Sequence, residues 1–354
     1  MKGTLKKFIL RTLLAALPVF IMVAFYIVRD PFHVVHPVVN NSDGRDSVIA
    51  GNNAGFVSVE TYLAHNNERH YDSFIFGSSM SQNFKARDWQ KHIGSNASIL
   101  HFDASSETLE GMINKMNFLN EHGTTIKNAL IVIEEKMLRR HPVENDILYA
   151  QHPATAGMDK WFNFHCIFFN ALRNTTMLKK TILNTIDKEK EQQKSELNDE
   201  VADRIDIINE NFYSIIDSLI EHDPGKFFTP ERLAARQHAR LPAQIVPAIT
   251  QEVEAQLLTI KKILDKNGTC FLILVPPCNY KQTLMEPDLW ALKSVFGHDK
   301  VHDFSSAIGY VNNELLYYDL MGHLISAKCK VLLDSAYKEL ESPSLPNPYY
   351  QITS

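Results

Sequence analysis

Apolar and polar positions divide the chain into one long apolar segment near the N-terminus and, after residue 70, short apolar runs separated by amphipathic stretches. The short runs predict strands at 72–76, 97–102, 129–134, 269–275 and 300–304. The clearest is Thr-Cys-Phe-Leu-Ile-Leu-Val at 269–275, which Pro276 and Pro277 end. An apolar run without polar alternation is typical of a parallel strand that is buried on both faces.

Amphipathic segments separate these runs and predict helices at 81–92, 106–121, 250–266 and 325–340. In the second of them, apolar residues recur three and four positions apart, as on the buried face of a helix: Leu109, Met112, Ile113, Met116 and Leu119. Asn267 and Gly268 provide a typical helix end after the third. Strands that alternate with helices predict an α/β fold whose parallel sheet of about five strands is covered on both faces.

Residues 141–250 interrupt this alternation, and we expect them to form an inserted helical cap over the strand ends. The insertion contains an aromatic stretch at 161–172, a charged stretch at 179–204 that predicts a solvated helix, and a helical apolar stripe at 205–219. The expected organisation is an anchor at 1–29, a linker and lead-in at 30–70, an α/β domain made of 71–140 and 251–345, and the cap.

The apolar segment at 8–28 is long enough to cross a bilayer, since its 21 residues span roughly 31 Å as a helix. Lys2, Lys6, Lys7 and Arg11 lie at its N-terminal end, whereas Arg29 alone follows it closely. The positive-inside rule then predicts a single-pass protein of the bacterial cytoplasmic membrane, with its N-terminus inside and its globular domain extracytoplasmic. A cleaved signal peptide is the alternative, but no small-residue cleavage site follows Val28.

Charge and cysteine content narrow the function. A net charge of −5 gives no electrostatic reason to expect nucleic acid as a partner. The four cysteines fit no metal-binding spacing. An exported domain leaves a disulfide open, and Cys270 in a strand and Cys329 in a helix are expected to act as small buried side chains. The chain also lacks a glycine-rich phosphate loop, and we expect neither a metal nor a cofactor.

The stretch that follows the first predicted strand, Gly77-Ser78-Ser79-Met80-Ser81, places hydroxyl side chains where open α/β sheets hold their ligands. These serines could simply cap a helix. A second stretch near the C-terminus favours chemistry instead, because Asp319 and His323 lie in one loop just before the last predicted helix. Serine nucleophiles need such a base, and the base needs a residue that orients it.

A Gly-x-Ser turn after the first strand, together with an Asp and a His before the last helix, resembles the SGNH (GDSL-like) hydrolase superfamily. The resemblance covers about 71–135 and 268–340, and it is greatest to membrane-anchored bacterial members. These include the D-alanyl transfer protein of teichoic acid biosynthesis and the SGNH-like proteins of exopolysaccharide acetylation. It implies a flavodoxin-like three-layer sandwich in which Ser79 is the nucleophile, His323 the base and Asp319 its orienting carboxylate. The oxyanion hole would use backbone N–H groups of Ser79 and of the Ser105 turn.

The chain departs from the family pattern in three places. Asp319 and His323 are four residues apart instead of three, the glycine of the second block is replaced around Ser105, and Glu134 and Glu135 occupy the region where many members have Gly-x-Asn. Because neighbouring strand residues point to opposite faces, Glu134 and Glu135 are not expected to form an acid–base pair. Arg139 and Arg140 read either as an anion site or as a solvated charge pair.

The resemblance implies an extracytoplasmic serine esterase or acyltransferase that acts on acyl esters of a cell-surface glycan, with a membrane O-acyltransferase as a possible partner. Two alternatives stay open at this point. One is a non-catalytic scaffold or glycan-binding protein of an envelope biosynthesis complex, and the other is a lipid-directed esterase. An acyl-chain tunnel beneath 161–172 would favour the lipid-directed enzyme.

Overall fold

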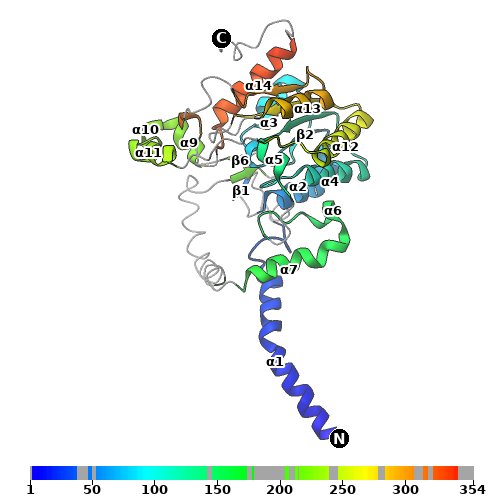
Figure 1. The fold of residues 1–354 in the computed structure, drawn as a ribbon. Coiled ribbons are helices and arrows are strands. Elements are labelled where there is room, and N and C mark those ends of the chain that lie inside the picture. Colours follow the sequence, from blue (N-terminus) through cyan, green and yellow to red (C-terminus); the bar gives the residue numbers. More distant parts are fainter. Residues whose placement is uncertain are drawn as a thin grey trace.

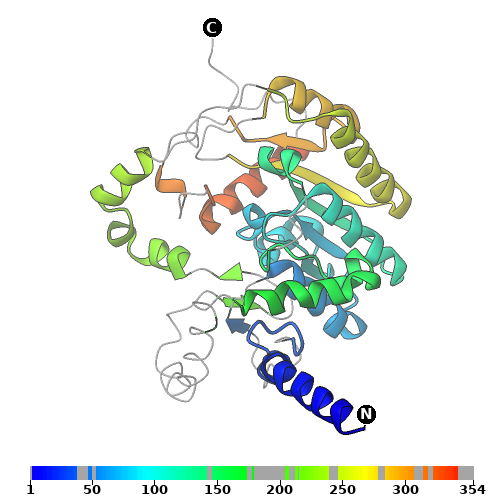
Figure 2. The same ribbon diagram turned by 60° about the horizontal axis from the view of Figure 1, so that its bottom comes forward.

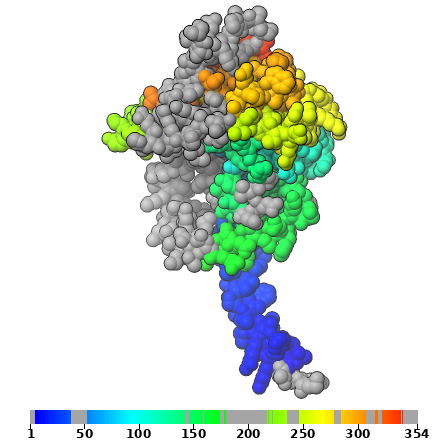
Figure 3. Space-filling model, in the orientation of Figure 1, coloured from blue at the N-terminus to red at the C-terminus, as the bar shows by residue number. Residues whose placement is uncertain are grey.

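The computed structural model describes residues 2–37, 47–49, 53–141, 146–173, 178, 204–206, 212–213, 215–238, 246–277, 284–306, 314–317 and 322–341. Helix α1 (Lys2–Arg29) projects from the globular part as a stalk (Figure 1; Figure 3). Within it, the 25 residues Leu5–Arg29 are long and apolar enough to cross a membrane. The carboxylate of Asp30 then accepts hydrogen bonds from the N–H groups of Val34, Val35 and His36, and these bonds fix the turn that leaves the helix.

The centre of the protein is a five-stranded, entirely parallel sheet with the order β3-β2-β4-β7-β8. Its strands are β2 (Ser73–Phe76), β3 (Ile99–His101), β4 (Asn128–Val132), β7 (Cys270–Val275) and β8 (Val301–Asp303). Counted along the chain, this is the flavodoxin-like order 2-1-3-4-5. All five predicted strands are confirmed, and the strand order reverses between β2 and β4.

Two separate cores cover the two faces of the sheet. Side chains alternate between them along each strand, so that Phe74 and Phe76 join one core while Ile75 joins the other. Helices α2 (Ala54–Arg69), α4 (Leu109–Glu121), α12 (Gln251–Asn267) and α13 (Glu286–Phe296) pack on the first face, and α3 (Ala86–Ile93) and α14 (Ser326–Glu341) on the second. The α/β sandwich predicted from the sequence is therefore present, and its central strands are largely apolar because both faces are buried.

Most predicted helices are present, but the first starts late. A single 3-10 turn at Ser79–Ser81 follows β2, and α3 begins only at Ala86. The helix predicted at 106–121 begins at Leu109, because the Thr108 hydroxyl accepts the Gly111 N–H and caps it. Gly268, in the left-handed region at φ +63°, ends α12 as predicted.

The insertion at 141–250 contains strands as well as helices. Its helices are α6 (Pro153–Ala156), α7 (Trp161–Ala171), α9 (Ile215–His222), α10 (Pro224–Phe227) and α11 (Pro230–His238). Two short strands, β5 (Arg204–Asp206) and β6 (Phe212–Tyr213), lie between α7 and α9 in the sequence. The helical stripe predicted at 205–219 is wrong in its first part, since β5 and β6 form a small antiparallel sheet with β1 (Ser47–Ile49). Of the charged stretch predicted at 179–204, residues 179–203 lie outside the described residues and Arg204 begins β5.

Candidate active site

The turn after β2 is compact because Gly77 has no side chain. A Cβ at this position would lie 2.7 Å from Ser81 Cβ and 3.1 Å from the Val132 carbonyl oxygen. The Ser81 N–H and hydroxyl both donate to the Ser78 carbonyl, at 2.8 and 2.7 Å. The turn leaves Ser79 partly exposed, at the carboxyl end of β2 beside the point where the strand order reverses. Open α/β sheets bind their ligands at this place.

His323 reaches this serine from the other end of the chain. A hydrogen bond of 2.8 Å joins His323 Nε2 and Ser79 Oγ, which are 244 residues apart in the sequence. The distance lies within the range of roughly 2.6–3.2 Å expected for a nucleophile and its general base. The structure thus brings together two of the three residues predicted as catalytic; the third, Asp319, lies outside the described residues.

The backbone around His323 is pinned from two sides. The Asn83 side-chain amide donates to the Leu324 carbonyl at 2.6 Å, and the Ile325 N–H donates to the Leu316 carbonyl at 3.0 Å. Asn83 belongs to the segment between the serine turn and α3, so one side chain connects the nucleophile's segment to the base's loop. This contact restricts the movement of Ser79 relative to His323.

A carboxylate from the insertion caps the helix that follows His323. Asp217 in α9 is buried, accepts the Ser326 N–H at 2.9 Å and also hydrogen-bonds the Ser326 hydroxyl. This contact anchors the first turn of α14 and satisfies one of its unpaired N–H groups. The sequence offered no signal for it, because 109 residues separate Asp217 from Ser326.

Beside the serine turn, at the end of β4, lies an ion pair. Glu134 Oε1 accepts the Ser78 hydroxyl at 2.8 Å and Arg140 Nη2 at 3.0 Å, and Arg140 Nη1 donates to the Glu107 carbonyl at 2.8 Å. The prediction that Glu134 and Glu135 are neighbours on a strand is wrong, because β4 ends at Val132 and Glu135 begins the short helix α5 (Glu135–Arg139). Arg140 is held in this pair, and it is not one of two solvated arginines.

Arg139 is held as well. Its guanidinium pairs with the buried carboxylate of Glu135 and donates to the Val246 carbonyl. The solvated charge pair considered for Arg139 and Arg140 is therefore wrong for both residues. The two arginines instead connect the end of β4 to neighbouring loops.

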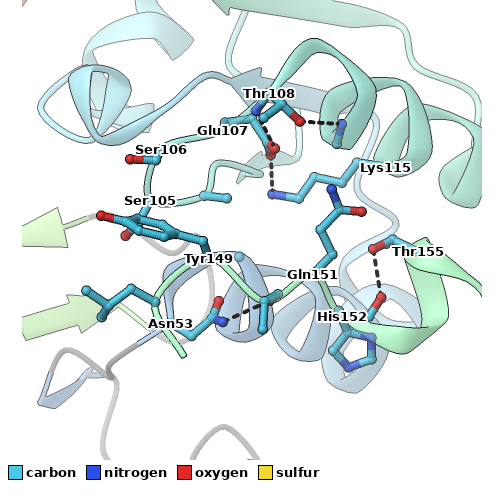
Figure 4. A pocket seen from close by; sticks show the side chains of 15 residues that line it. Asn53, Ser105, Ser106, Glu107, Thr108, Lys115, Tyr149, Gln151, His152 and Thr155 are labelled. Atoms are coloured by element: carbon cyan, nitrogen blue, oxygen red, sulfur yellow. Dashed lines mark hydrogen bonds and ion pairs between the residues drawn. The ribbon is translucent and has the colours of Figure 1, made fainter. Parts of the chain in front are cut away.

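The loop after β3 lies next to the same turn, since the Ala104 N–H donates to the Gly77 carbonyl at 3.3 Å. Ser105 follows in this loop and lines a cavity beyond it (Figure 4). Ten of the fifteen lining residues have polar or charged side chains: Asn53, Ser105, Ser106, Glu107, Thr108, Lys115, Tyr149, Gln151, His152 and Thr155. The role of Ser105 in an oxyanion hole stays a prediction, while its position beside the serine turn is observed.

A buried ion pair fixes this loop. Lys115 Nζ lies 3.0 Å from Glu107 Oε2 and also donates to the carbonyls of Phe102 and Asp103. Both charged side chains are about 5% exposed. The ammonium group therefore has two carbonyl acceptors and a carboxylate at ion-pair distance, and these contacts hold the loop after β3 in place at the cavity wall.

His101 supports the serine turn from below. It ends β3, is buried, and its Nε2 lies 2.9 Å from the Ser81 carbonyl, while Nδ1 lies 3.3 Å from Asp103 Oδ1. These contacts give His101 a structural role at the serine turn. Among the residues that the structure describes, no group of three or more metal-ligating side chains is found.

Three of the four cysteines fall in the described ranges, and all three are free. Burial raises the pKa of the Cys329 thiol far above its usual value, so it behaves as a small apolar side chain in α14. Cys270 is exposed at the start of β7, which contradicts the expectation that it is buried. Cys278 lies outside the described residues.

Neither the protein-family models nor the curated proteins contain a match to this chain. The features of the chain that bear on its function are therefore the geometry of Ser79 and His323, the fold and the apolar helix.

Proposed function

We propose that the protein is a membrane-anchored serine esterase or acyltransferase in which Ser79 is the nucleophile and His323 the general base. The observation that carries this proposal is the 2.8 Å hydrogen bond between His323 Nε2 and Ser79 Oγ. Its position at the carboxyl end of β2, beside the reversal of strand order, is where a flavodoxin-like sheet holds substrates. The resemblance of the two motifs to SGNH hydrolases supports the same assignment.

In the proposed reaction, Ser79 Oγ attacks the carbonyl carbon of an acyl ester and its proton passes to His323 Nε2. The imidazolium then gives that proton to the departing alcohol as the ester C–O bond breaks, which leaves the acyl group on Ser79. Water or a sugar hydroxyl attacks the acyl-enzyme and gives its own proton to His323. Ser79 Oγ leaves and regains a proton, so hydrolysis and transfer differ only in the acceptor.

The negative charge that develops on the carbonyl oxygen needs donors. We assign this role to backbone N–H groups of Ser79 and Ser105, whose loops are joined by the Ala104–Gly77 hydrogen bond. At the end of β4, the Glu134–Arg140 pair holds the Ser78 side chain. In this region many family members have an asparagine donor, and lacking one such donor costs about 10²–10³ in rate. Asp319 would orient His323.

We propose a sugar ester as the substrate in preference to a lipid. Ten of the fifteen residues that line the cavity beside the serine turn have polar or charged side chains (Figure 4), and such groups suit the hydrogen-bonding groups of a glycan. The aromatic stretch, in contrast, is occupied by its own packing, because Phe164 and Phe168 are buried against Phe56 and Phe32. We therefore favour an acyl ester of a cell-surface glycan over a lipid substrate, with a membrane O-acyltransferase as the proposed acyl source.

The apolar helix supports a location of the protein in the membrane. Leu5–Arg29 can cross a bilayer, and Lys2, Lys6 and Lys7 lie at its N-terminal end. By the positive-inside rule we infer that the N-terminus is cytoplasmic and that the Ser79 site faces the extracytoplasmic side. Cell-surface glycans are modified on that side.

The test uses the full chain in detergent with an aryl acetate as acyl donor, with and without acetyl-free surface glycan. We expect release of the aryl alcohol by the native protein and its loss in Ser79→Ala. Ser335→Ala is the matched control, because this hydroxyl lies on α14 and donates to its own helix at the Val331 carbonyl. Acetyl groups on the glycan indicate a transferase, and free acetate alone indicates an esterase. Equal rates for native protein and Ser79→Ala would overturn the proposal.

A further inference from the structure

Helix α7 lies across the end of α1 where α1 enters the globular part (Figures 1 and 2). Its His165 Nδ1 is 2.8 Å from the Tyr26 hydroxyl, and the rings of Tyr26 and Phe169 pack edge-on at 5.9 Å. Burial lowers the pKa of His165, which favours the neutral ring, and Nδ1 of that ring can accept a hydrogen bond from the tyrosine hydroxyl. The contact joins the insertion directly to the apolar helix.

The same contact belongs to a larger aromatic cluster that unites α1, its exit turn, α2 and α7. The buried members from the exit turn and the two later helices include Phe32, Phe56, Phe164 and Phe168. Phe56 stacks on Phe164 with ring centroids 5.5 Å apart, and Phe32 packs on Phe168 at the same centroid distance. Because α7 is packed on α2 as well as on α1, its position relative to the apolar helix is fixed.

That position sets the depth of α7. About twenty helical residues cross the hydrocarbon core, so a span that starts near Phe8 reaches the outer boundary close to Val28. Tyr26 lies three residues before Arg29, or about 4.5 Å inside the end of α1, and Met22 and Phe25 pack against the same cluster. The helix that covers them must lie at the level where acyl chains meet the headgroups.

Two large aromatic side chains at the start of α7 are left uncovered. Trp161 is 52% exposed and Phe162 is 73% exposed. Exposed Lys160 precedes them. Tryptophan is enriched at membrane interfaces, where its apolar ring and N–H group meet different surroundings, and lysine places its ammonium among headgroups. Exposed aromatic residues at this depth therefore match a lipid surface.

We propose that α7 is an interfacial helix that inserts Trp161 and Phe162 into the outer leaflet beside the end of α1. The proposal rests on the membrane anchoring that is part of the proposed function. A second protein is the other possible occupant of an apolar surface. The lipid surface is favoured because α7 packs directly on residues of the apolar helix, so the bilayer is already present at that level.

The consequence for the site is a fixed distance from the membrane. Ala150 belongs to the aromatic cluster, and the Asn53 side-chain amide donates to the Ala150 and Ile147 carbonyls, each at 2.9 Å. Asn53 and Ala150 also line the cavity that contains Ser105. One layer of residues thus separates the cavity from α7, and we infer that the Ser79 site takes acyl esters presented close to the membrane surface.

Tryptophan quenching tests this inference. The full chain carrying Trp290→Phe, reconstituted in phosphatidylcholine vesicles, retains Trp89, which is fully buried, and Trp161. Brominated phosphatidylcholine is expected to quench the Trp161 share of the emission, whereas aqueous acrylamide quenches little of it. Bromine placed near the headgroup end of the acyl chain should quench more than bromine near the bilayer centre.

The matched control is Trp161→Phe, which keeps Trp290, a residue 67% exposed on α13. This variant should lose lipid quenching and gain quenching by acrylamide. Flotation of the vesicles separates the two ways to fail. Protein that does not float with lipid contradicts the membrane anchoring, while protein that floats with Trp161 open to acrylamide and closed to brominated lipid overturns the interfacial helix alone.

Discussion

Replacing His323 by alanine is expected to lower the rate of ester cleavage at Ser79 by about 10²–10⁴-fold, the contribution typical of a positioned general base. The reason is geometric, since His323 Nε2 is 2.8 Å from the hydroxyl that must lose its proton. The rate is measured from the release of the aryl alcohol from an aryl acetate. The fall should appear in kcat, because the base acts in the chemical step and contributes little to substrate binding.

His298→Ala is the control for this prediction. His298 is exposed in the turn between α13 and β8. This turn lies at the amino end of β8, whereas Ser79 follows the carboxyl end of β2, so loss of His298 should leave the rate unchanged. His323→Gln should be nearly as slow as the alanine variant, because its amide can bond Ser79 but cannot accept a proton at neutral pH. Full activity in His323→Gln would show that His323 only positions the serine.

The second large effect concerns stability. Lys115→Met is expected to lower the free energy of unfolding by about 3–5 kcal/mol, since it leaves the Glu107 carboxylate buried without its counter-charge. The ion pair is 3.0 Å long and almost fully buried. Urea denaturation followed by circular dichroism measures the change in midpoint.

The double variant Glu107→Leu with Lys115→Met is the test of that explanation. Replacing both charges removes the unpaired carboxylate, so the double variant should regain most of the lost stability. If it is as unstable as Lys115→Met alone, then the loss comes from the packing of the lysine chain and from its bonds to the Phe102 and Asp103 carbonyls, and not from the buried charge.

The sheet was predictable because its strands are buried on both faces. In β7, Leu272 and Leu274 pack into one core while Ile273 packs into the other, so an uninterrupted apolar run is required by the fold and visible in the sequence. Helix ends were predictable where a single residue sets them, as Gly268 does for α12. The Ser79–His323 pair was predictable because both residues lie in short motifs at loops that parallel strands place on one edge.

Contacts between distant segments could not be predicted in the same way. Asp217 caps α14 from the insertion, and Arg140 pairs with Glu134 over the Ser78 hydroxyl. Each depends on a fold that local periodicity does not specify. The stripe at 205–219 failed for a related reason, since Ile205 and Phe212 lie in strands that pair with each other and, through β5, with β1, far along the chain.

The central claim is that Ser79 is an activated nucleophile, and covalent labelling tests it most directly. The folded full chain is treated with a fluorophosphonate, and intact mass and peptide mapping follow. We expect one adduct on Ser79, none on neighbouring Ser78, and none in Ser79→Ala. Slow labelling in His323→Ala would link the reactivity to the observed hydrogen bond. A folded native protein that takes up no label, or takes it up equally in Ser79→Ala, would contradict the catalytic account.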